Sequence, residues 1–235
     1  MGNSSRQPSS INHATDSALL YIIKKCNDFD VSGVGDNKEW DKTGWTPFTL
    51  LQKDGLPYAS KSKMMYSEKG LYLLFWGEDK KITTQNWNDG ENIYDGDVFE
   101  VFFHPDPTKP PYFEYEINPL RKELILTLAR FGKNSIAWSP WSGENKEDKL
   151  IKREVKINGG KQEIGASITS WTAELFFPYQ VLALLPNSPP VSGTVWDANF
   201  CRIDYDNGKQ NEYSWSPTML TGFHSLQYFQ KIKFE

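Results

Sequence analysis

Short segments in which apolar and polar residues alternate, each bounded by glycine or proline, constrain the fold of this chain more than any other feature. The segments 98–104 and 112–118 alternate most clearly, and a period of two is typical of β-strands with one buried face. The residues predicted to face the core are Phe99, Val101, Phe103, Phe113, Tyr115 and Ile117. The opposite face then carries Glu100 and Phe102 beside a polar row of Tyr112, Glu114, Glu116 and Asn118.

The rest of the chain continues this pattern. Residues 71–76 form an apolar run, whose length predicts a strand buried on both faces in mid-sheet. Further strands are predicted at 123–131, 162–168, 172–177, 194–205 and 230–234. Pro178 suits the first position of a short helix ending near Leu185. We therefore predict an all-β fold, an antiparallel two-sheet β-sandwich of jelly-roll or immunoglobulin-like type, with at most one short helix near 178–185.

Composition agrees with this fold class. Aromatic residues make up 14% of the 235 residues, and 17 glycines and 14 prolines supply turns. Aromatic residues favour strands, and this length allows one large domain. We expect an N-terminal tail and lead-in strand over 1–28 and a single sandwich over 29–235. Cys26 and Cys201 stand far apart without a CxxC partner, so two buried thiols are favoured over one disulfide.

Charge and hydropathy exclude some partners. The chain carries 26 basic and 30 acidic residues, a net charge of −4, and no Lys/Arg block. Nucleic acid is therefore an unsuitable partner, whereas neutral or cationic ligands suit the chain. No apolar run approaches the roughly 20 residues that a membrane-spanning helix needs. Residues 1–10 contain no hydrophobic region of a secretory signal.

Catalytic motifs are absent from the sequence. There is no GxSxG, P-loop or HExxH motif, and the chain has only three histidines. A glycosidase needs two flanking carboxylates, which Asp97, Glu100, Glu114 and Glu116 could supply. Acidic residues on exposed strand faces are more common, so we predict a non-catalytic protein.

Metal and haem sites are weighed in the same way. Residues 204–208 copy the opening of a calcium loop, but the predicted strands around them favour a hairpin turn. Asp79, Asp95 and Asp97 could hold a structural calcium ion, although aspartate is also a common turn residue. No cofactor is required. A non-covalent haem would need an axial Met/His pair. The residues that could supply such a pair are Met64, Met65, Met219, His104 and His224.

Aromatic residues in predicted turns and loops point to sugar binding. They are Trp40, Trp45, Trp87, Tyr94, Trp138, Trp141, Trp215 and Phe223. A flat ring covers the apolar C–H face of a sugar, while neighbouring polar groups bind its hydroxyls. Two such contacts of roughly 100 Å² each would contribute about 5 kcal/mol before association costs.

The order of motifs resembles the family 9 carbohydrate-binding modules and the wider DOMON-like β-sandwich superfamily. The segments that carry the resemblance are GLYL at 70–73, IYDGDVFEVF at 93–102, YEIN at 115–118, WTAELFFP at 171–178, NFCR at 199–202, SWSP at 214–217 and FHS at 223–225. The resemblance runs from about Phe29 to the C-terminus and implies a module that accompanies glycan-degrading enzymes.

The resemblance also implies site residues. The two aromatic residues that clamp a terminal sugar in the family fall on Tyr94 and Phe223, and the sugar-binding Glu and Asn on Glu100 and Asn118. The family's arginine is replaced by Glu116, which implies a different pattern of sugar hydroxyls. A glutamine of the family falls on Cys201, and Cys201 and Asn199 are both predicted as sugar-binding residues. Acidic positions associated with calcium in the family fall on Asp79 and Asp97.

The expected function is therefore non-catalytic binding of a terminal sugar of a plant or host polysaccharide or oligosaccharide, in support of glycan degradation. The alternatives are a haem-binding, DOMON-like electron-transfer domain and a glycoside hydrolase accessory domain that no longer binds sugar. Similarity to secreted modules implies an exported bacterial protein, periplasmic, cell-surface or extracellular, whose leader is missing from this sequence.

Overall fold

The computed structural model describes residues 20–131, 134–138, 151–217 and 222–235, which form β-strands and short 3-10 helices but no α-helix. The strands are β1 Leu20–Lys25, β2 Thr46–Pro47, β3 Thr49–Leu50, β4 Ser60–Tyr66, β5 Gly70–Glu78, β6 Val98–His104, β7 Pro111–Ile117, β8 Glu123–Phe131, β9 Asn134–Trp138, β10 Lys152–Asn158, β11 Ser170–Pro178, β12 Val195–Asp204, β13 Asn211–Ser214 and β14 Gln230–Phe234. The 3-10 helices are η1 Lys38–Lys42, η2 Ile93–Asp95, η4 Tyr179–Leu182, η5 Asp206–Gly208 and η6 Leu226–Tyr228. None of these helices is long and apolar enough to cross a membrane.

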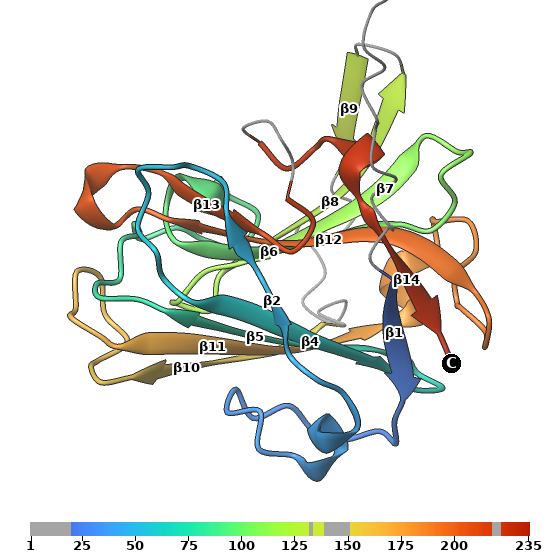
Figure 1. Ribbon diagram of the computed structural model, residues 1–235, viewed down its shortest axis with the longest axis horizontal. Coiled ribbons are helices and arrows are strands. Elements are labelled where there is room, and N and C mark those ends of the chain that lie inside the picture. Colours follow the sequence, from blue (N-terminus) through green and yellow to red (C-terminus); the bar gives the residue numbers. More distant parts are fainter. Residues whose placement is uncertain (1–19, 132–133, 139–150, 218–221) are drawn as a thin grey trace, which may run out of the picture.

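The strands form one strongly curled sheet that folds back on itself into two facing layers (Figure 1). The strand order is β10-β11-β5-β4-β1-β14-β12-β6-β7-β8-β9, and β13 pairs with β12 and β3. In Figure 1 the layer of β12, β6 and β7 lies above the layer of β4, β5 and β11. Strands β1 and β14 lie at the side where the sheet turns from one layer into the other.

Strand β1 makes the sheet mixed. Its first four residues pair in parallel with 231–234 of β14, and Lys24 and Lys25 pair in parallel with Met65 and Tyr66 of β4. The other pairings between described strands are antiparallel. The prediction of an all-β fold is confirmed, and the purely antiparallel pairing is corrected at β1.

The main core fills the space between the two layers. All six predicted core residues of β6 and β7 belong to it, and each is fully buried. The rings of Phe75 and Phe99 stack across the layers at a centroid distance of 5.0 Å. This packing leaves the other face of β6 and β7 outside the main core, as the alternation predicted.

Among the other predicted strands, 71–76 is confirmed and 162–168 is not. The apolar run 71–76 lies in β5, between β4 and β11, as predicted. The predicted strand 162–168 is wrong, because this stretch forms turns in which Gly165 adopts a φ of 76°. Residues 144–156 mix charges of both signs, a pattern typical of a solvated loop. Residues 144–150 lie outside the described part of the chain, and β10 begins at Lys152.

The shorter features are also resolved. The helix predicted from Pro178 to about Leu185 is only the 3-10 helix η4, and other 3-10 turns occur that the sequence analysis did not predict. Residues 204–208 form the turn between β12 and β13, as expected, with Asn207 at a φ of 62°. Cys26 and Cys201 are buried free thiols.

Candidate functional site

A second hydrophobic cluster covers the outer face of the layer that contains β6, β7, β8 and β12. It includes Phe102 of β6, Tyr112 of β7 and Leu128 of β8, and it is covered by Ile93 of η2 and Phe223. Figure 1 shows the described residues before β14, 222–229, on this side of the layer. Two loops that are far apart in the sequence, one with Ile93 of η2 and the other with Phe223, therefore cover the polar row of β6 and β7.

A pocket of about 310 Å³ opens in this covered face. Its lining consists of Tyr94, Glu100, Glu114, Glu116, Leu126, Leu128, Ile203, Gln210, Glu212, Gly222, Phe223 and His224. Four of the predicted site residues, Tyr94, Glu100, Glu116 and Phe223, thus meet in one pocket. The volume lies at the lower end of the usual range for ligand pockets, about 300–1,000 Å³, which suits a ligand of one or two rings.

Three glutamates lie together in this pocket. Glu100 of β6 and Glu116 of β7 are directly opposite each other in the antiparallel ladder, and Glu114 lies two residues along β7. Period two places all three on the same face of the sheet. Their exposed fractions are 3%, 1% and 3% for Glu100, Glu116 and Glu114. Carboxylate oxygens from the three residues lie within 4.8 Å of one another.

Burial sets the electrostatics of these glutamates. Burial raises the pKa of Glu114 to about 7. The pKa values of Glu100 and Glu116 are raised well above the usual range, first by burial and then by repulsion from neighbouring carboxylates. The imidazole of His224 lies 3.9 Å from the Oε2 atom of Glu114. The pocket therefore favours either protonated carboxyl groups or a bound positive charge.

Aromatic side chains form part of the pocket wall. Tyr94 belongs to η2 and is partly buried, whereas Phe223 is only 4% exposed. The Phe223 ring packs against Phe102, with ring centroids 6.4 Å apart. A ligand can therefore contact more of the Tyr94 ring than of the Phe223 ring.

Asn118 lies at the end of the polar row but does not line the pocket. Its Oδ1 atom accepts hydrogen bonds from the backbone N–H groups of Leu120 and Lys122, at 3.0 and 2.9 Å. Its Nδ2 atom donates to the hydroxyl of Thr84 at 3.3 Å. These bonds stabilise the turn between β7 and β8, so the amide serves the turn.

Asn199 and Cys201 of β12 are fully buried and also lie outside the pocket lining. The Oδ1 atom of Asn199 accepts hydrogen bonds from the backbone N–H of Ser216 and from the hydroxyl of Ser214, both at 3.0 Å. Cys201 is the ladder partner of Glu100, and burial raises the pKa of its thiol far above the usual range. Both residues support the strands beneath the pocket.

Eight of the twelve lining residues were not predicted as sugar-binding residues, and Glu114, Gln210 and Glu212 are among them. Glu114 was placed on the polar row, and its period-two spacing from Glu116 was the signal that could have identified it. Gln210 lies just before β13, and Glu212 is the second residue of this strand. No alternation marks this short strand, so the sequence offered no comparable signal for them.

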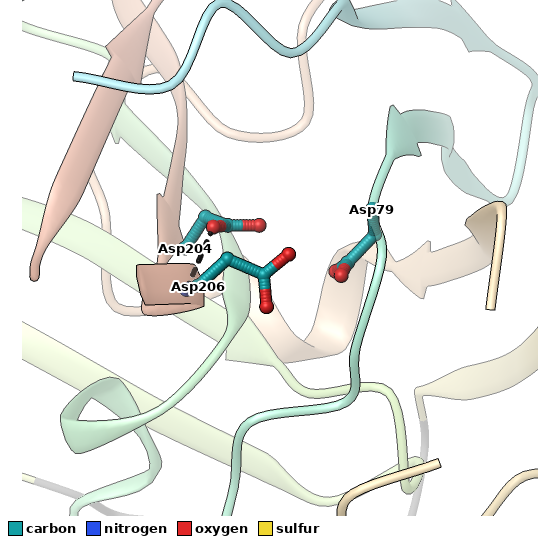
Figure 2. A group of neighbouring side chains, drawn as sticks. All are labelled: Asp79, Asp204 and Asp206. Carbon is teal, nitrogen blue, oxygen red and sulfur yellow. Dashed lines mark hydrogen bonds between the residues drawn. The ribbon is translucent and has the colours of Figure 1, made fainter. Parts of the chain in front are cut away.

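The acidic residues predicted to hold calcium lie elsewhere. Asp79 follows β5 and lies near Asp204 and Asp206, at the end of β12 and in η5 (Figure 2). The guanidinium group of Arg202 donates to Asp79 at 3.1 Å and to Asp204 at 2.5 Å. Arg202 is fully buried, so a protein cation already lies among these carboxylates.

The carboxylate oxygens of Asp79 and Asp97 accept hydrogen bonds from the protein. Both oxygens of Asp79 accept hydrogen bonds, Oδ1 from the backbone N–H of Lys81 and Oδ2 from Arg202 and the indole N–H of Trp171. Both oxygens of Asp97 accept backbone N–H groups, from Thr83 at 2.6 Å and Tyr205 at 2.9 Å. Each of these four oxygens therefore has at least one protein donor, and the guanidinium group of Arg202 also brings a positive charge to Asp79.

The residues considered for haem ligation have separate roles. Met64 and Met65 of β4 are fully buried in two different hydrophobic clusters. The Nε2 atom of His104 lies 2.8 Å from the carbonyl oxygen of Lys109. Met219 and Trp141 lie outside the described residues.

Comparisons with known proteins identify the fold. No family profile and no curated protein matches the chain in sequence. A candidate carbohydrate-binding protein from Bacteroides uniformis has a similar structure, with a TM-score of 0.77 and 16% identity over 93% of this chain and 100% of that chain. A family 9 carbohydrate-binding module from Caldicellulosiruptor kristjanssonii in complex with glucose has a TM-score of 0.62 and 12% identity, covering 92% of this chain and 96% of that one. The module in complex with cellotriose gives 0.58 and 12%, covering 92% and 94%. The chain therefore has the fold of a family 9 carbohydrate-binding module.

Proposed function

We propose that this protein is a non-catalytic carbohydrate-binding module that holds a terminal sugar in the pocket between β6, β7 and the 222–224 segment. The observation that carries the proposal is that one pocket gathers Tyr94, Phe223, Glu100 and Glu116. Aromatic rings and carboxylates are complementary to a sugar, which has apolar C–H faces and hydroxyl donors.

The similar structures support this assignment, because two of them are family 9 modules in complex with glucose and cellotriose. The buried glutamates accept hydrogen bonds from sugar hydroxyls when they are ionised, and they also donate when protonated. Nothing in the pocket requires turnover of the ligand. The module would act beside glycan-degrading enzymes, as an exported protein that locates their substrate.

The test is calorimetric titration of the protein with a panel of mono- and oligosaccharides that includes glucose and cellotriose. Tyr94→Ala removes the more accessible ring of the pocket. If the ring covers about 100 Å² of sugar, its loss costs about 2.5 kcal/mol at 25 cal/mol/Å², or about 70-fold in affinity.

Trp45→Ala is the matched control, because Trp45 is an exposed aromatic residue (38%) that is not among the pocket residues. Its removal should leave sugar affinity unchanged. Equal loss in both variants, or equal affinity of Tyr94→Ala and wild-type protein, would contradict the proposed site. No heat with any sugar would contradict the proposed function.

A further inference from the structure

The glutamate group of the pocket, Glu100, Glu114 and Glu116, carries an unbalanced charge. When all three are ionised they bring three negative charges into a site where each of the three residues is at most 3% exposed. In the described part of the chain, the one basic side chain within ion-pair distance is His224, on Glu114. Buried charges are stable only when they are paired, so the group lacks compensating positive charge.

Two oxygens of this group have unused hydrogen-bonding capacity. The Oε2 atoms of Glu114 and Glu116 are enclosed and have no hydrogen-bond donor among the described residues other than each other's carboxyl group. Both residues line the open pocket. Buried polar atoms almost always have a partner, so these two oxygens indicate a ligand that enters from the pocket.

We propose that the glutamate group binds a divalent cation with a preference for oxygen ligands, such as Ca²⁺ or Mn²⁺, at the base of the pocket. Calcium binds oxygens at about 2.3–2.6 Å, so ligands on opposite sides of one ion lie about 4.6–5.2 Å apart. Three carboxylate oxygens within 4.8 Å of one another therefore fit within a single coordination shell.

The cation would complete the sugar site. Three protein oxygens leave open several of the six to eight positions that calcium fills, and these positions would face the pocket. Neighbouring hydroxyls of a sugar can occupy them, which would make sugar binding depend on the cation. This second step rests on the proposed function, whereas the cation site itself does not.

Charge favours a metal ion over the ammonium group of an amino sugar. A divalent cation leaves one net negative charge on the three ionised glutamates, whereas an ammonium group leaves two. The other acidic group, at Asp79, Asp204 and Asp206, differs because the buried Arg202 already supplies a positive charge there. It therefore provides a matched control.

The experiment uses the full chain, stripped with EDTA, returned to chelator-free buffer and titrated calorimetrically with CaCl₂ and with MnCl₂. Glu116→Gln keeps the shape of the side chain and removes its charge, and it should weaken cation binding by about tenfold or more. Asp206→Asn should leave that affinity unchanged. Glu100→Gln serves as a second variant, and circular dichroism checks that each variant folds.

Two outcomes of these cation titrations would overturn the cation site. One is the absence of cation binding to wild-type protein, which would mean that the glutamates hold protons instead. The other is binding that Asp206→Asn abolishes and Glu116→Gln leaves intact, which would assign the cation to the aspartate group.

Sugar titrations in EDTA and in CaCl₂ separate this inference from the proposed function. Sugar binding that needs the cation supports both. Full sugar binding in EDTA refutes the bridging role and leaves the proposed function standing. Glucosamine binding in EDTA that Glu116→Gln abolishes, together with no heat from CaCl₂ or MnCl₂, would assign the glutamate group to an ammonium ligand instead of a metal ion. Cation binding without binding of any sugar supports the site and contradicts the proposed function.

Discussion

The pocket glutamates are the residues at which sequence and environment conflict most. Carboxylates prefer water, yet the alternation that buries Phe113 and Tyr115 in the core also directs Glu114 and Glu116 to the opposite face, where two loops cover them. The result is a group of acids whose pKa values are raised by burial. A raised pKa makes stability depend on pH.

Glu114 provides a direct test. Its folded-state pKa of about 7 exceeds the ordinary value of 4.5, so between these pH values the folded state binds more protons than the unfolded state. In metal-free protein its contribution to stability is therefore complete below about pH 4.5 and is lost as the pH rises to about 7. Urea unfolding of wild-type and Glu114→Gln protein over this range should show a smaller fall in the variant.

The comparison isolates Glu114 from Asp79, whose pKa is also raised to about 7, because Asp79 contributes equally to both proteins. The groups that face Glu114 are Glu100, Glu116 and His224. Because Glu114 raises the pKa of Glu100 and Glu116, the variant also lowers their pKa values, and this acts in the same direction as the loss of Glu114. Identical pH profiles would show that Glu114 keeps an ordinary pKa in the folded state.

At the scale of elements, β1 has an unusual position because it pairs with strands of both layers. Ile23 is fully buried in the main core, whereas Leu20 of the same strand is 51% exposed. Ile23→Ala should lower the free energy of unfolding by about 2–5 kcal/mol, since it leaves a cavity. Leu20→Ala should change it by less than about 0.5 kcal/mol. Chemical denaturation measures both, and equal losses would contradict the assigned role of β1.

Elements with strict alternation could be predicted from the sequence, and others could not. Strand β6 was predicted with its observed bounds and its buried face, since Phe99, Val101 and Phe103 repeat at period two. Strand β10 was missed because its half-exposed residues mix charges of both signs. The predicted strand at 162–168 failed because Gly165 adopts a turn conformation that the apolar residues around it do not reveal.

The candidate site follows the same division. Local alternation brought Glu100, Glu114 and Glu116 to one face, and the family resemblance added Tyr94 and Phe223. Asn118 lies on the expected face, but its side-chain amide accepts hydrogen bonds from the backbone N–H groups of Leu120 and Lys122 in the next turn. The position of these N–H groups depends on the conformation of the turn, which the alternation does not predict. Gln210 and Glu212 line the pocket because β13 pairs with β12. The residue pattern alone does not predict this pairing.

At the scale of the whole molecule, the pocket is separate from the packing that holds the two layers together. The main core lies between the layers, and the pocket lies on the outer face of one of them. Fold and binding can therefore vary independently, which is consistent with the shared fold at 12–16% identity to the similar structures.

The most direct test of the central claim is an NMR titration of ¹⁵N-labelled protein with the sugar of the panel that binds most tightly, in the presence of CaCl₂. We expect the largest amide shifts to be confined to η2, to β6 and β7 around the glutamates, and to residues 222–224. Shifts centred on another surface, such as that around Trp45, would contradict the assignment of the pocket as the carbohydrate-binding site.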